Sequence, residues 1–186
     1  PYRKPLVIFS PKSLLRHKES VSPLSEFAAS KFNPVNWEWN EDIKPEKAKR
    51  IVLCSGKVYY DMAGREKLTN TIALVRIEQL YPFPDVQLAG VLQKYRNAKE
   101  IVWVQEEPEN MGAWEFARPL LLDLLGSRQR LRYVGRARAS SPVSGTTSVF
   151  RCCSIRHKRT CRTGRLMTWA RAVAGTRIRS PSSKAV

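Results

Sequence analysis

The tripeptide Ser55-Gly56-Lys57 follows an apolar run and precedes a segment with helical spacing. A glycine at such a junction lets backbone amides face an anion at the start of the helix, and Lys57 would add a positive charge. Neither the Walker pattern nor a dinucleotide-binding fingerprint surrounds these residues, so they support a phosphate site only weakly. The alternative is a tight turn that closes a helix onto a sheet, and the sequence favours it.

Two neighbouring carboxylates, Glu106 and Glu107, lie within Gln105-Glu106-Glu107-Pro108 after another apolar run. Paired acids can shift each other's pKa and act as a general acid and base. Adjacent residues of an extended segment point to opposite sides, however, and need not share one site. We expect these residues to make interface or turn-capping contacts rather than form a catalytic dyad. Gly112 and Trp114 are expected to pack where the next helix begins.

The two histidines do not support a catalytic or metal-binding arrangement. His17 lies in a charged segment, and the second histidine belongs to a cluster that superficially resembles a zinc site, made of Cys152, Cys153, His157 and Cys161. Adjacent cysteines lack the usual separation of about two to four residues between zinc ligands. We therefore expect no metal site. With one histidine before residue 150, no Ser-His-Asp or Cys-His arrangement can be argued.

The distribution of the net charge of +17 matters more than its size. From Phe150 onward there are ten Lys and Arg and no acidic residue, which leaves 23 basic and 16 acidic residues in 1–149, a net +7. The basic tail could bind phosphate backbones, but it offers no aromatic platform beyond Trp169. We expect no nucleic-acid partner. The tail, 150–186, has too little apolar surface for a core and is predicted to be disordered.

Alternating strand-like and helix-like segments must position these residues. Apolar runs predict strands at 6–9, Arg50–Cys54, Ile72–Ile77, 100–104 and 131–134. Helical spacing predicts helices over 13–18, 22–30, from 57 through 67, over 84–96, and over 113–125. Ser22 before Pro23 is the expected cap of the second helix. In the helix over 84–96, the expected buried face comprises Val86, Leu88, Val91, Leu92 and Tyr95.

The pattern predicts a three-layer αβα fold with a mainly parallel sheet, because most strands are apolar on both faces and alternate with helices. Residues 33–49 are expected to form an irregular excursion with one short strand. Binding and interface chemistry in such sheets lies at the carboxyl ends of the strands. Ser55-Gly56, residues 78–82 and residues 105–108 stand at those ends.

No apolar run approaches the roughly 20 residues of a membrane span, and none resembles a signal peptide. We expect a protein without a membrane partner. Cys54 lies inside an apolar run and is expected to act as a small hydrophobic residue in a reducing compartment. Because the chain opens on Pro1 rather than Met, we expect it to begin within a longer product.

Five motifs resemble, in order, the C-terminal region of the thiamine-dependent first component of 2-oxoglutarate dehydrogenase. They are PKSLLRH (11–17), CSGKVYYD (54–61), RIEQLYPFP (76–84), QEEPENMGAW (105–114), and the stretch from YVGR (133–136) to Ser141-Pro142. The resemblance is collinear over residues 3–149. The related 2-oxoadipate dehydrogenase shares much of this pattern and is the alternative. The fold implied is that of the transketolase C-terminal domain.

The resemblance implies an enzyme that decarboxylates 2-oxoglutarate in the tricarboxylic acid cycle with thiamine diphosphate and Mg²⁺, and passes the succinyl group to a lipoyl domain. The catalytic residues and cofactor ligands of the family lie in two preceding domains, so no catalytic or cofactor-binding residue is expected here. The implied partners are a second copy in a homodimer, the lipoyl succinyltransferase core and lipoamide dehydrogenase. The implied location is the mitochondrial matrix, with the bacterial cytoplasm as the alternative.

In some bacterial relatives this domain takes part in an acetyl-CoA regulatory pocket. Lys31 and Gln79 match contacting positions of that pocket. The arginine pair that the family carries after Pro84 is replaced by Val86 and Gln87. Two missing guanidiniums remove much of the attraction for a multiply charged ligand. We expect no acetyl-CoA regulation.

The sequence departs from the family after Val149, where relatives continue with a histidine and a closing helix. We therefore expect a family domain over 1–149 and a non-family tail over 150–186, from a frameshift, a retained intron or an alternative terminus. The leading interpretation is an enzyme fragment that is not catalytic alone. The alternatives are a stand-alone adaptor or nucleotide-sensing module, and a nucleic-acid binder that uses the basic tail.

Overall fold

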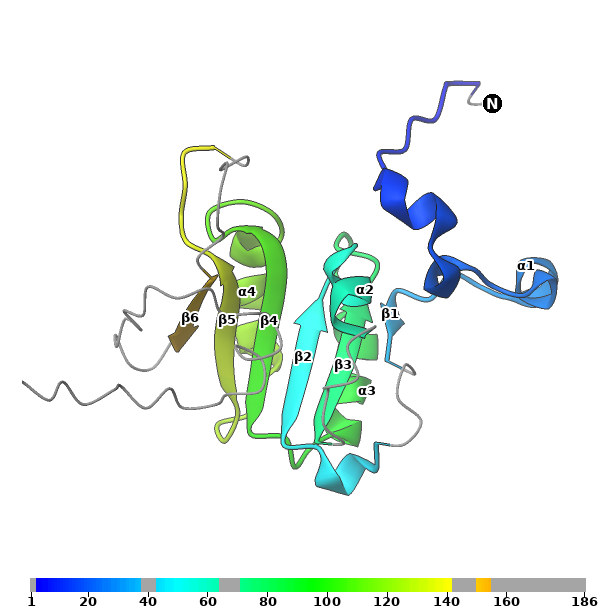
Figure 1. The fold of residues 1–186 in the computed structure, drawn as a ribbon. Helices are drawn as coiled ribbons and strands as arrows, with labels where there is room; N and C mark the ends of the chain where they lie inside the picture. Colours follow the sequence, from blue (N-terminus) through cyan, green and yellow to red (C-terminus); the bar gives the residue numbers. More distant parts are fainter. Residues whose placement is uncertain (1–2, 38–42, 64–70, 142–149, 155–186) are drawn as a thin grey trace, which may run out of the picture. The chain divides into compact units, whose positions relative to one another are not determined.

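The computed structural model describes residues 3–37, 43–63, 71–141 and 150–154 of the chain. The chain divides into two compact units, residues 1–33 and residues 34–186. The first unit contains two 3-10 helices, Lys12–Arg16 and Lys18–Ser20, followed by α1 (Leu24–Ala29) (Figure 1). The second unit contains the sheet.

Two predictions for the first unit are wrong. Residues 6–9 form no strand, and Leu6 and Phe9 are 84% and 97% exposed. An apolar run becomes a strand only where a neighbour pairs with it, and in this unit no strand is described. The cap of α1 is Pro23 rather than Ser22, and no side chain caps the helix.

The sheet has six strands in the order β1-β3-β2-β4-β5-β6 (Figure 1). The bounds are β1 (Val35–Asn36), β2 (Arg50–Cys54), β3 (Ile72–Ile77), β4 (Glu100–Pro108), β5 (Arg130–Arg136) and β6 (Phe150–Ser154). The four central strands run parallel to one another, whereas β1 and β6 pair antiparallel with β3 and β5. The mainly parallel sheet predicted from the sequence is confirmed. The irregular excursion before β2 contains β1 and a 3-10 helix, Pro45–Lys47.

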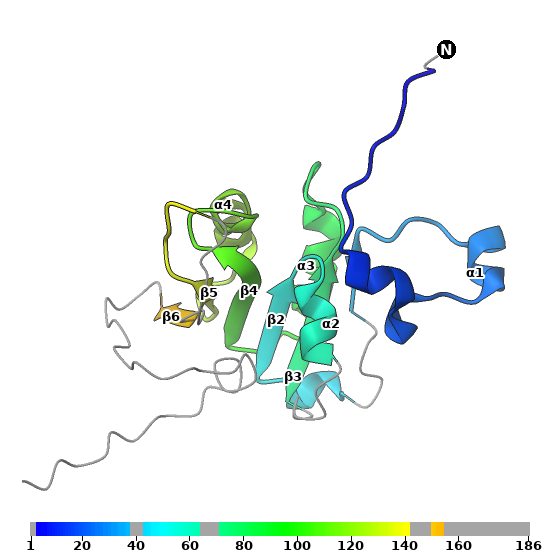
Figure 2. The ribbon, with the colours of Figure 1, turned by 45° about the horizontal axis from the view of Figure 1, so that its top comes forward.

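Helices cover both faces of the sheet and make three layers. α2 (Val58–Ala63) lies on one face, and α3 (Asp85–Lys94) and α4 (Trp114–Leu124) lie on the other (Figures 1 and 2). Two hydrophobic clusters result, one between the sheet and α2, and a larger one between the sheet and the α3 and α4 layer. The strands alternate their side chains between the two clusters, which is why β2 is apolar at consecutive positions.

The prediction is wrong for one residue of the expected buried face of α3. Leu88, Val91, Leu92 and Tyr95 are buried, but Val86 is 76% exposed. Val86 lies two positions before Leu88, and at about 100° per residue that places it on the opposite side of the helix.

The sheet extends beyond the predicted end of the domain. Phe150–Ser154 forms β6 and pairs with β5, with Phe150 opposite Arg136 and Ser154 opposite Arg132. The predicted disorder is therefore wrong for residues 150–154, because the backbone groups of an edge strand can pair whatever their side chains. The remainder of the predicted tail, 155–186, lies outside the described residues.

Cys54 confirms its predicted role as a buried hydrophobic residue. It is fully buried at the end of β2, and its Sγ contacts the carbonyl of Val75 at 3.7 Å. Burial raises the pKa of its thiol well above the ordinary value. In the part of the chain that the structure describes, no helix combines the length and apolar character needed to cross a membrane.

Candidate functional site

The carboxyl ends of β2, β3 and β4 meet at the place where the strand order reverses. The chain passes from β2 to β3 on one side and then crosses back past β2 to β4 on the other. Open parallel sheets bind their ligands or partners in the crevice at this switch point. The polar strand ends predicted from the sequence are therefore brought together here.

A cleft of about 440 Å³ lies at this switch point. Its lining is mainly apolar and aromatic, with one carboxylate, and comprises Ser55, Gly56, Leu80, Tyr81, Trp103, Gln105, Glu107, Gly112, Ala113 and Phe116. Tyr81 and Phe116 are 83% and 45% exposed. Phe116 also meets Phe83 edge to face, with ring centroids 6.3 Å apart. Such a surface can bury apolar contacts from a partner.

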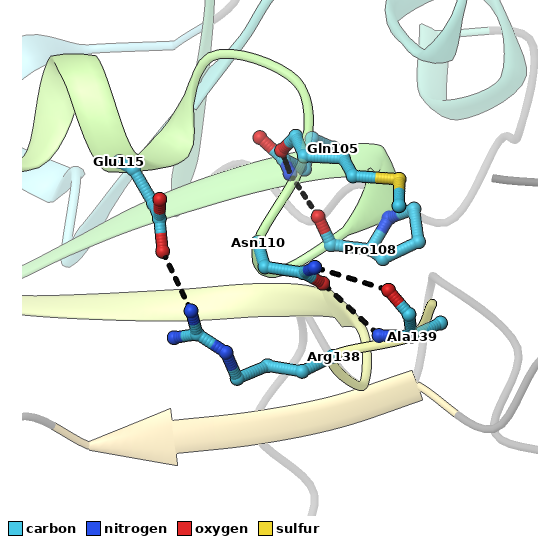
Figure 3. A network of polar contacts seen from close by, with 7 residues as sticks. Gln105, Pro108, Asn110, Glu115, Arg138 and Ala139 are labelled. Atoms are coloured by element: carbon cyan, nitrogen blue, oxygen red, sulfur yellow. Dashed lines mark hydrogen bonds and ion pairs between the residues drawn. The ribbon is translucent and has the colours of Figure 1, made fainter. Parts of the chain in front are cut away.

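Gln105 organises the floor of the cleft. Its side chain is 3% exposed, and Oε1 accepts hydrogen bonds of 3.0 Å from both Trp103 Nε1 and the Trp114 amide. Its Nε2 donates to the Pro108 carbonyl at 3.0 Å (Figure 3). It also donates to the Met111 carbonyl at 2.7 Å and makes a longer contact with the Glu107 carbonyl. A buried amide with all its donors and acceptors engaged fixes the path of the backbone around it.

The same loop is fixed from the other side by Asn110. Asn110 Nδ2 donates to the Ala139 carbonyl, and the Ala139 amide donates back to Asn110 Oδ1, each at 3.0 Å (Figure 3). Next to this pair, Arg138 contacts Glu115 of α4 at 3.0 Å. The segment after β5 is thereby tied both to the β4–α4 loop and to the helix that follows it.

Gly112 allows the loop to close onto Gln105. Its φ of +67° lies in the left-handed region that favours glycine. A Cβ here would stand 3.1 Å from Glu107 Cβ and 3.2 Å from Gln105 Nε2. The predicted packing role of Gly112 and Trp114 is confirmed, since Trp114 is buried against Tyr133 with ring centroids 5.1 Å apart.

Ser55-Gly56-Lys57 forms a turn between β2 and α2, with Gly56 at φ +72°. Lys57 Nζ contacts Asp61 at 3.2 Å and Glu106 at 3.8 Å. The hydrogen bond to Asp61, helped by the charge of Glu106, raises the pKa of Lys57 despite partial burial. Because two carboxylates already compensate this ammonium, the arrangement fits the tight turn and not a phosphate cradle.

Glu106 and Glu107 lie on opposite faces of the sheet. Glu106 reaches Lys57 on the α2 side, whereas Glu107 lines the cleft with Trp103 and Gln105 on the other side. The two carboxylates therefore do not share one site, as the alternation along a strand predicts. The interface or turn-capping contacts expected of these two residues stay a prediction.

The two residues carried over from the regulatory pocket lie in different units. Lys31 is an exposed residue of the unit 1–33, and Gln79 follows β3 in the other unit. Gln79 Nε2 donates to the Pro82 carbonyl at 2.7 Å, next to the cis peptide between Tyr81 and Pro82. Their proposed role stays a prediction.

His17 has a local structural contact. Its Nδ1 accepts a hydrogen bond from the Glu19 amide at 3.3 Å and so caps the second 3-10 helix. His157 and Cys161 of the superficial zinc pattern lie outside the described residues. Within the described ranges, no group of three His, Cys, Asp or Glu could hold a metal ion.

The sequence analysis assigned no role to two residues that shape the cleft, Gln105 as a buried hydrogen-bonding centre and Asn110 as a clamp on the loop. The available signal was a polar residue that continues an otherwise buried strand: Gln105 directly follows Val104. A buried amide must find partners, and a strand end supplies free backbone groups.

Comparison with known proteins finds a family match that covers all the described strands except the last residue of β6. The family model described as 2-oxoglutarate dehydrogenase C-terminal matches residues 21–153. The match begins later than the resemblance in the sequence and ends four residues beyond Val149, within β6.

Curated proteins called 2-oxoglutarate dehydrogenase E1 component are similar to this chain. The protein of Cupriavidus necator is 48% identical over 146 residues, which is 77% of this chain and 15% of the relative. That of Coxiella burnetii is 45% identical and covers 81% of this chain and 16% of the relative. The protein of Bacillus cereus is 43% identical, and the match covers 76% of this chain and 16% of the relative. The chain thus spans about one sixth of the length of these relatives.

Proposed function

Because the chain belongs to the 2-oxoglutarate dehydrogenase C-terminal family, we propose that it is the non-catalytic C-terminal part of a 2-oxoglutarate dehydrogenase E1 component. In this role the domain packs at the homodimer interface and supports the catalytic domains. The observation that carries the proposal is the aromatic cleft at the switch point, built on the fully bonded Gln105.

The cleft supports docking better than chemistry. Glu107 is its one carboxylate, and its lining contains a serine but no histidine or cysteine to act with it. Tyr81 and Phe116 offer the exposed aromatic surface that is typical of the centre of protein interfaces. The occupant that we propose is the second copy of the full-length enzyme.

The activity of the full-length protein follows from its relatives. We propose that the whole enzyme decarboxylates 2-oxoglutarate with thiamine diphosphate and Mg²⁺, and works with a lipoyl succinyltransferase core and lipoamide dehydrogenase. Following the family resemblance, we propose that the cofactor is held by the preceding domains of the full-length enzyme. The relatives named above are bacterial, which supports the cytoplasmic alternative over the mitochondrial matrix.

A domain exchange tests this function. Residues 21–153 would replace the matching region of the Cupriavidus necator enzyme, and 2-oxoglutarate-dependent release of carbon dioxide would be measured for the chimera, for that enzyme truncated before the region, and for this chain alone. We expect an active chimera, an inactive truncated enzyme and an inactive chain. Decarboxylation by the chain alone, or full activity of the truncated enzyme, would refute the proposal.

A pair of variants, one inside and one outside the cleft, tests the proposed docking role. In the chimera, Tyr81→Glu should weaken dimerisation about tenfold or more, because a charge would be buried at an aromatic contact. Val86→Glu is the matched control, since Val86 is similarly exposed at 76% but does not line the cleft. Sedimentation velocity over a range of concentrations measures both. Equal weakening by the two variants would place the interface elsewhere.

We also propose that acetyl-CoA does not regulate this protein. Lys31 and Gln79 remain from the regulatory pocket, but Val86 and Gln87 stand where the arginine pair is expected. In the active chimera, acetyl-CoA should leave the rate unchanged, and calorimetry should detect no tight binding. Tight binding by the chimera would overturn this proposal without affecting the structural role of the domain.

A further inference from the structure

A second cavity, of about 620 Å³, lies at the opposite edge of the sheet, where the parallel strands begin. The starts of β2, β4 and β5 are in register, with Glu100 next to both Arg50 and Arg130. In Figure 1 this is the lower edge of the sheet, remote from the switch point. The charged side chains that line the cavity are Lys49, Arg50, Lys99, Glu100, Arg128 and Arg130.

The one carboxylate of the cavity is already engaged. Glu100 Oε2 accepts a hydrogen bond from Arg50 Nε at 2.6 Å, and its Oε1 contacts Arg132. Burial alone would raise the pKa of Glu100, but the hydrogen bonds and charges of Arg132 and Arg50 outweigh it and hold that pKa below the ordinary value. Glu100 is thus ionised at neutral pH, and its single charge is shared between two guanidiniums.

Four further cations of the cavity have no such compensation. Within the described residues, the side chains of Lys49, Lys99, Arg128 and Arg130 form no ion pair. Five cations therefore face one carboxylate, a formal net charge of +4 within one cavity. Like charges held this close repel one another, and an anion that binds among them relieves the repulsion.

The lining also indicates the kind of anion. It contains no aromatic and no aliphatic hydrophobic residue, so an acyl chain would find no hydrophobic side chain on which to pack. Two arginines can bind oxyanions in a bidentate manner, and two lysines add point charges. A cavity of about 620 Å³ has room for several linked charged groups.

We propose that this cavity binds a compact polyanion whose closely spaced phosphate or carboxylate groups contact Lys49, Lys99, Arg128 and Arg130. The site is separate from the cleft at the switch point: the residues that line the two share no member. Binding here is therefore independent of the docking role and is tested in the isolated chain.

Calorimetric titrations of the whole chain with inorganic tripolyphosphate and with citrate test the proposal, at about 0.15 M salt so that distant surface charges are screened. We expect saturable binding of at least one anion to one site. The double variant Lys99→Gln/Arg130→Gln should weaken it about tenfold or more, since it removes two of the contacting charges. Tighter binding of tripolyphosphate identifies phosphate as the natural group, and tighter binding of citrate identifies carboxylate.

Two matched controls remove the same charge elsewhere. Lys44→Gln/Lys47→Gln changes exposed residues that do not line the cavity, and Arg171→Gln/Arg177→Gln changes the basic tail. Both should bind within about twofold of the original chain. Circular dichroism confirms that the variants are folded, which is expected because Lys99 and Arg130 are exposed. The absence of saturable binding, or an equal loss in either control, would overturn the proposal.

Discussion

The side chain of Asn110 and the backbone of Ala139 form a reciprocal pair of hydrogen bonds, 29 residues apart in the sequence. An amide side chain carries the same donor and acceptor as a peptide group, so Asn110 pairs with Ala139 as a neighbouring strand would. Ala139 lies three residues beyond the end of β5 at Arg136, and Asn110 lies two residues beyond the end of β4 at Pro108. It extends the tie between β4 and β5 past the sheet and into the loops at the cleft (Figure 3).

Loss of this pair should destabilise the domain. Asn110→Ala removes both hydrogen bonds and leaves the Ala139 amide and carbonyl to water, which should lower the free energy of unfolding by about 1–2 kcal/mol. Urea denaturation followed by tryptophan fluorescence measures the change. Asn97→Ala is the matched control, because Asn97 is exposed and no hydrogen bond of its side chain is described. A similar loss for both variants would show that the pair contributes nothing specific.

Gln105 should be more sensitive than any exposed amide. Gln105→Leu leaves the indole nitrogen of Trp103, the Trp114 amide and two close carbonyls without partners, and should cost about 3–5 kcal/mol. Gln93→Leu, at an exposed position of α3, should change stability by about 0.5 kcal/mol or less. Chemical denaturation of both variants provides the comparison. A small effect at Gln105 would mean that water replaces its bonds.

The ion pairs of Glu100 should make stability depend on pH in the acidic range. A carboxyl whose folded-state pKa lies below its ordinary 4.5 stabilises the fold above that value, and the contribution is lost as the pH falls through the folded-state pKa. Glu100→Gln should therefore lower stability at pH 7 by about 1–2 kcal/mol, since its side chain is partly exposed, and the difference should narrow as the pH falls.

Thermal unfolding from pH 7 to pH 3 measures that difference. Glu115→Gln serves as the control because the pair of Glu115 with Arg138 is more than half exposed on both sides, and its loss should cost about 0.5 kcal/mol or less. A gap between Glu100→Gln and the original chain that widens toward low pH would contradict the assigned role of Arg50 and Arg132.

Two glycines should respond to alanine in opposite directions. Gly112→Ala forces a residue with a Cβ into a φ of +67° and against Glu107 and Gln105, and should destabilise by about 1–2 kcal/mol. Gly90→Ala, within α3 and with nothing within 4 Å of the added Cβ, should stabilise by about 0.5–1 kcal/mol. Urea denaturation midpoints of the two variants measure these changes. Stabilisation by both substitutions would contradict the prediction and show that the loop at Gly112 shifts to accommodate a Cβ.

The central sheet could be predicted because its strands are defined by local sequence. β2 and β3 have the predicted bounds, since all their residues except Arg50 and Arg76 are apolar and buried. β4 is longer than predicted: Gln105, Glu106 and Glu107 continue the strand although they are polar. Residues 6–9 and β6 show the opposite errors, because pairing depends on whether a partner strand is adjacent and not only on apolar character.

The position of the candidate site could be predicted from the sequence, but the hydrogen bonds that shape it could not. The carboxyl ends of the strands and the opposed directions of Glu106 and Glu107 follow from strand polarity and alternation alone. The hydrogen bonds of Gln105 could not be predicted, since most of them reach backbone atoms whose positions depend on the turn at Gly112. The cationic cavity was also hidden, because Lys49, Lys99 and Arg128 are distant in the sequence and meet only through strand register.

The way in which Gln105 contacts its loop bears on how this family can diverge. Between the end of β4 and the start of α4, the Gln105 side chain bonds only backbone atoms, at Pro108, Met111 and Trp114. The path of the loop therefore depends on Gln105 together with Asn110 and Gly112, whereas no hydrogen bond or ion pair of the Glu109 side chain is described. Substitutions at partly exposed positions of the loop such as Glu109 can therefore change which partner it contacts while the backbone path of the loop stays the same.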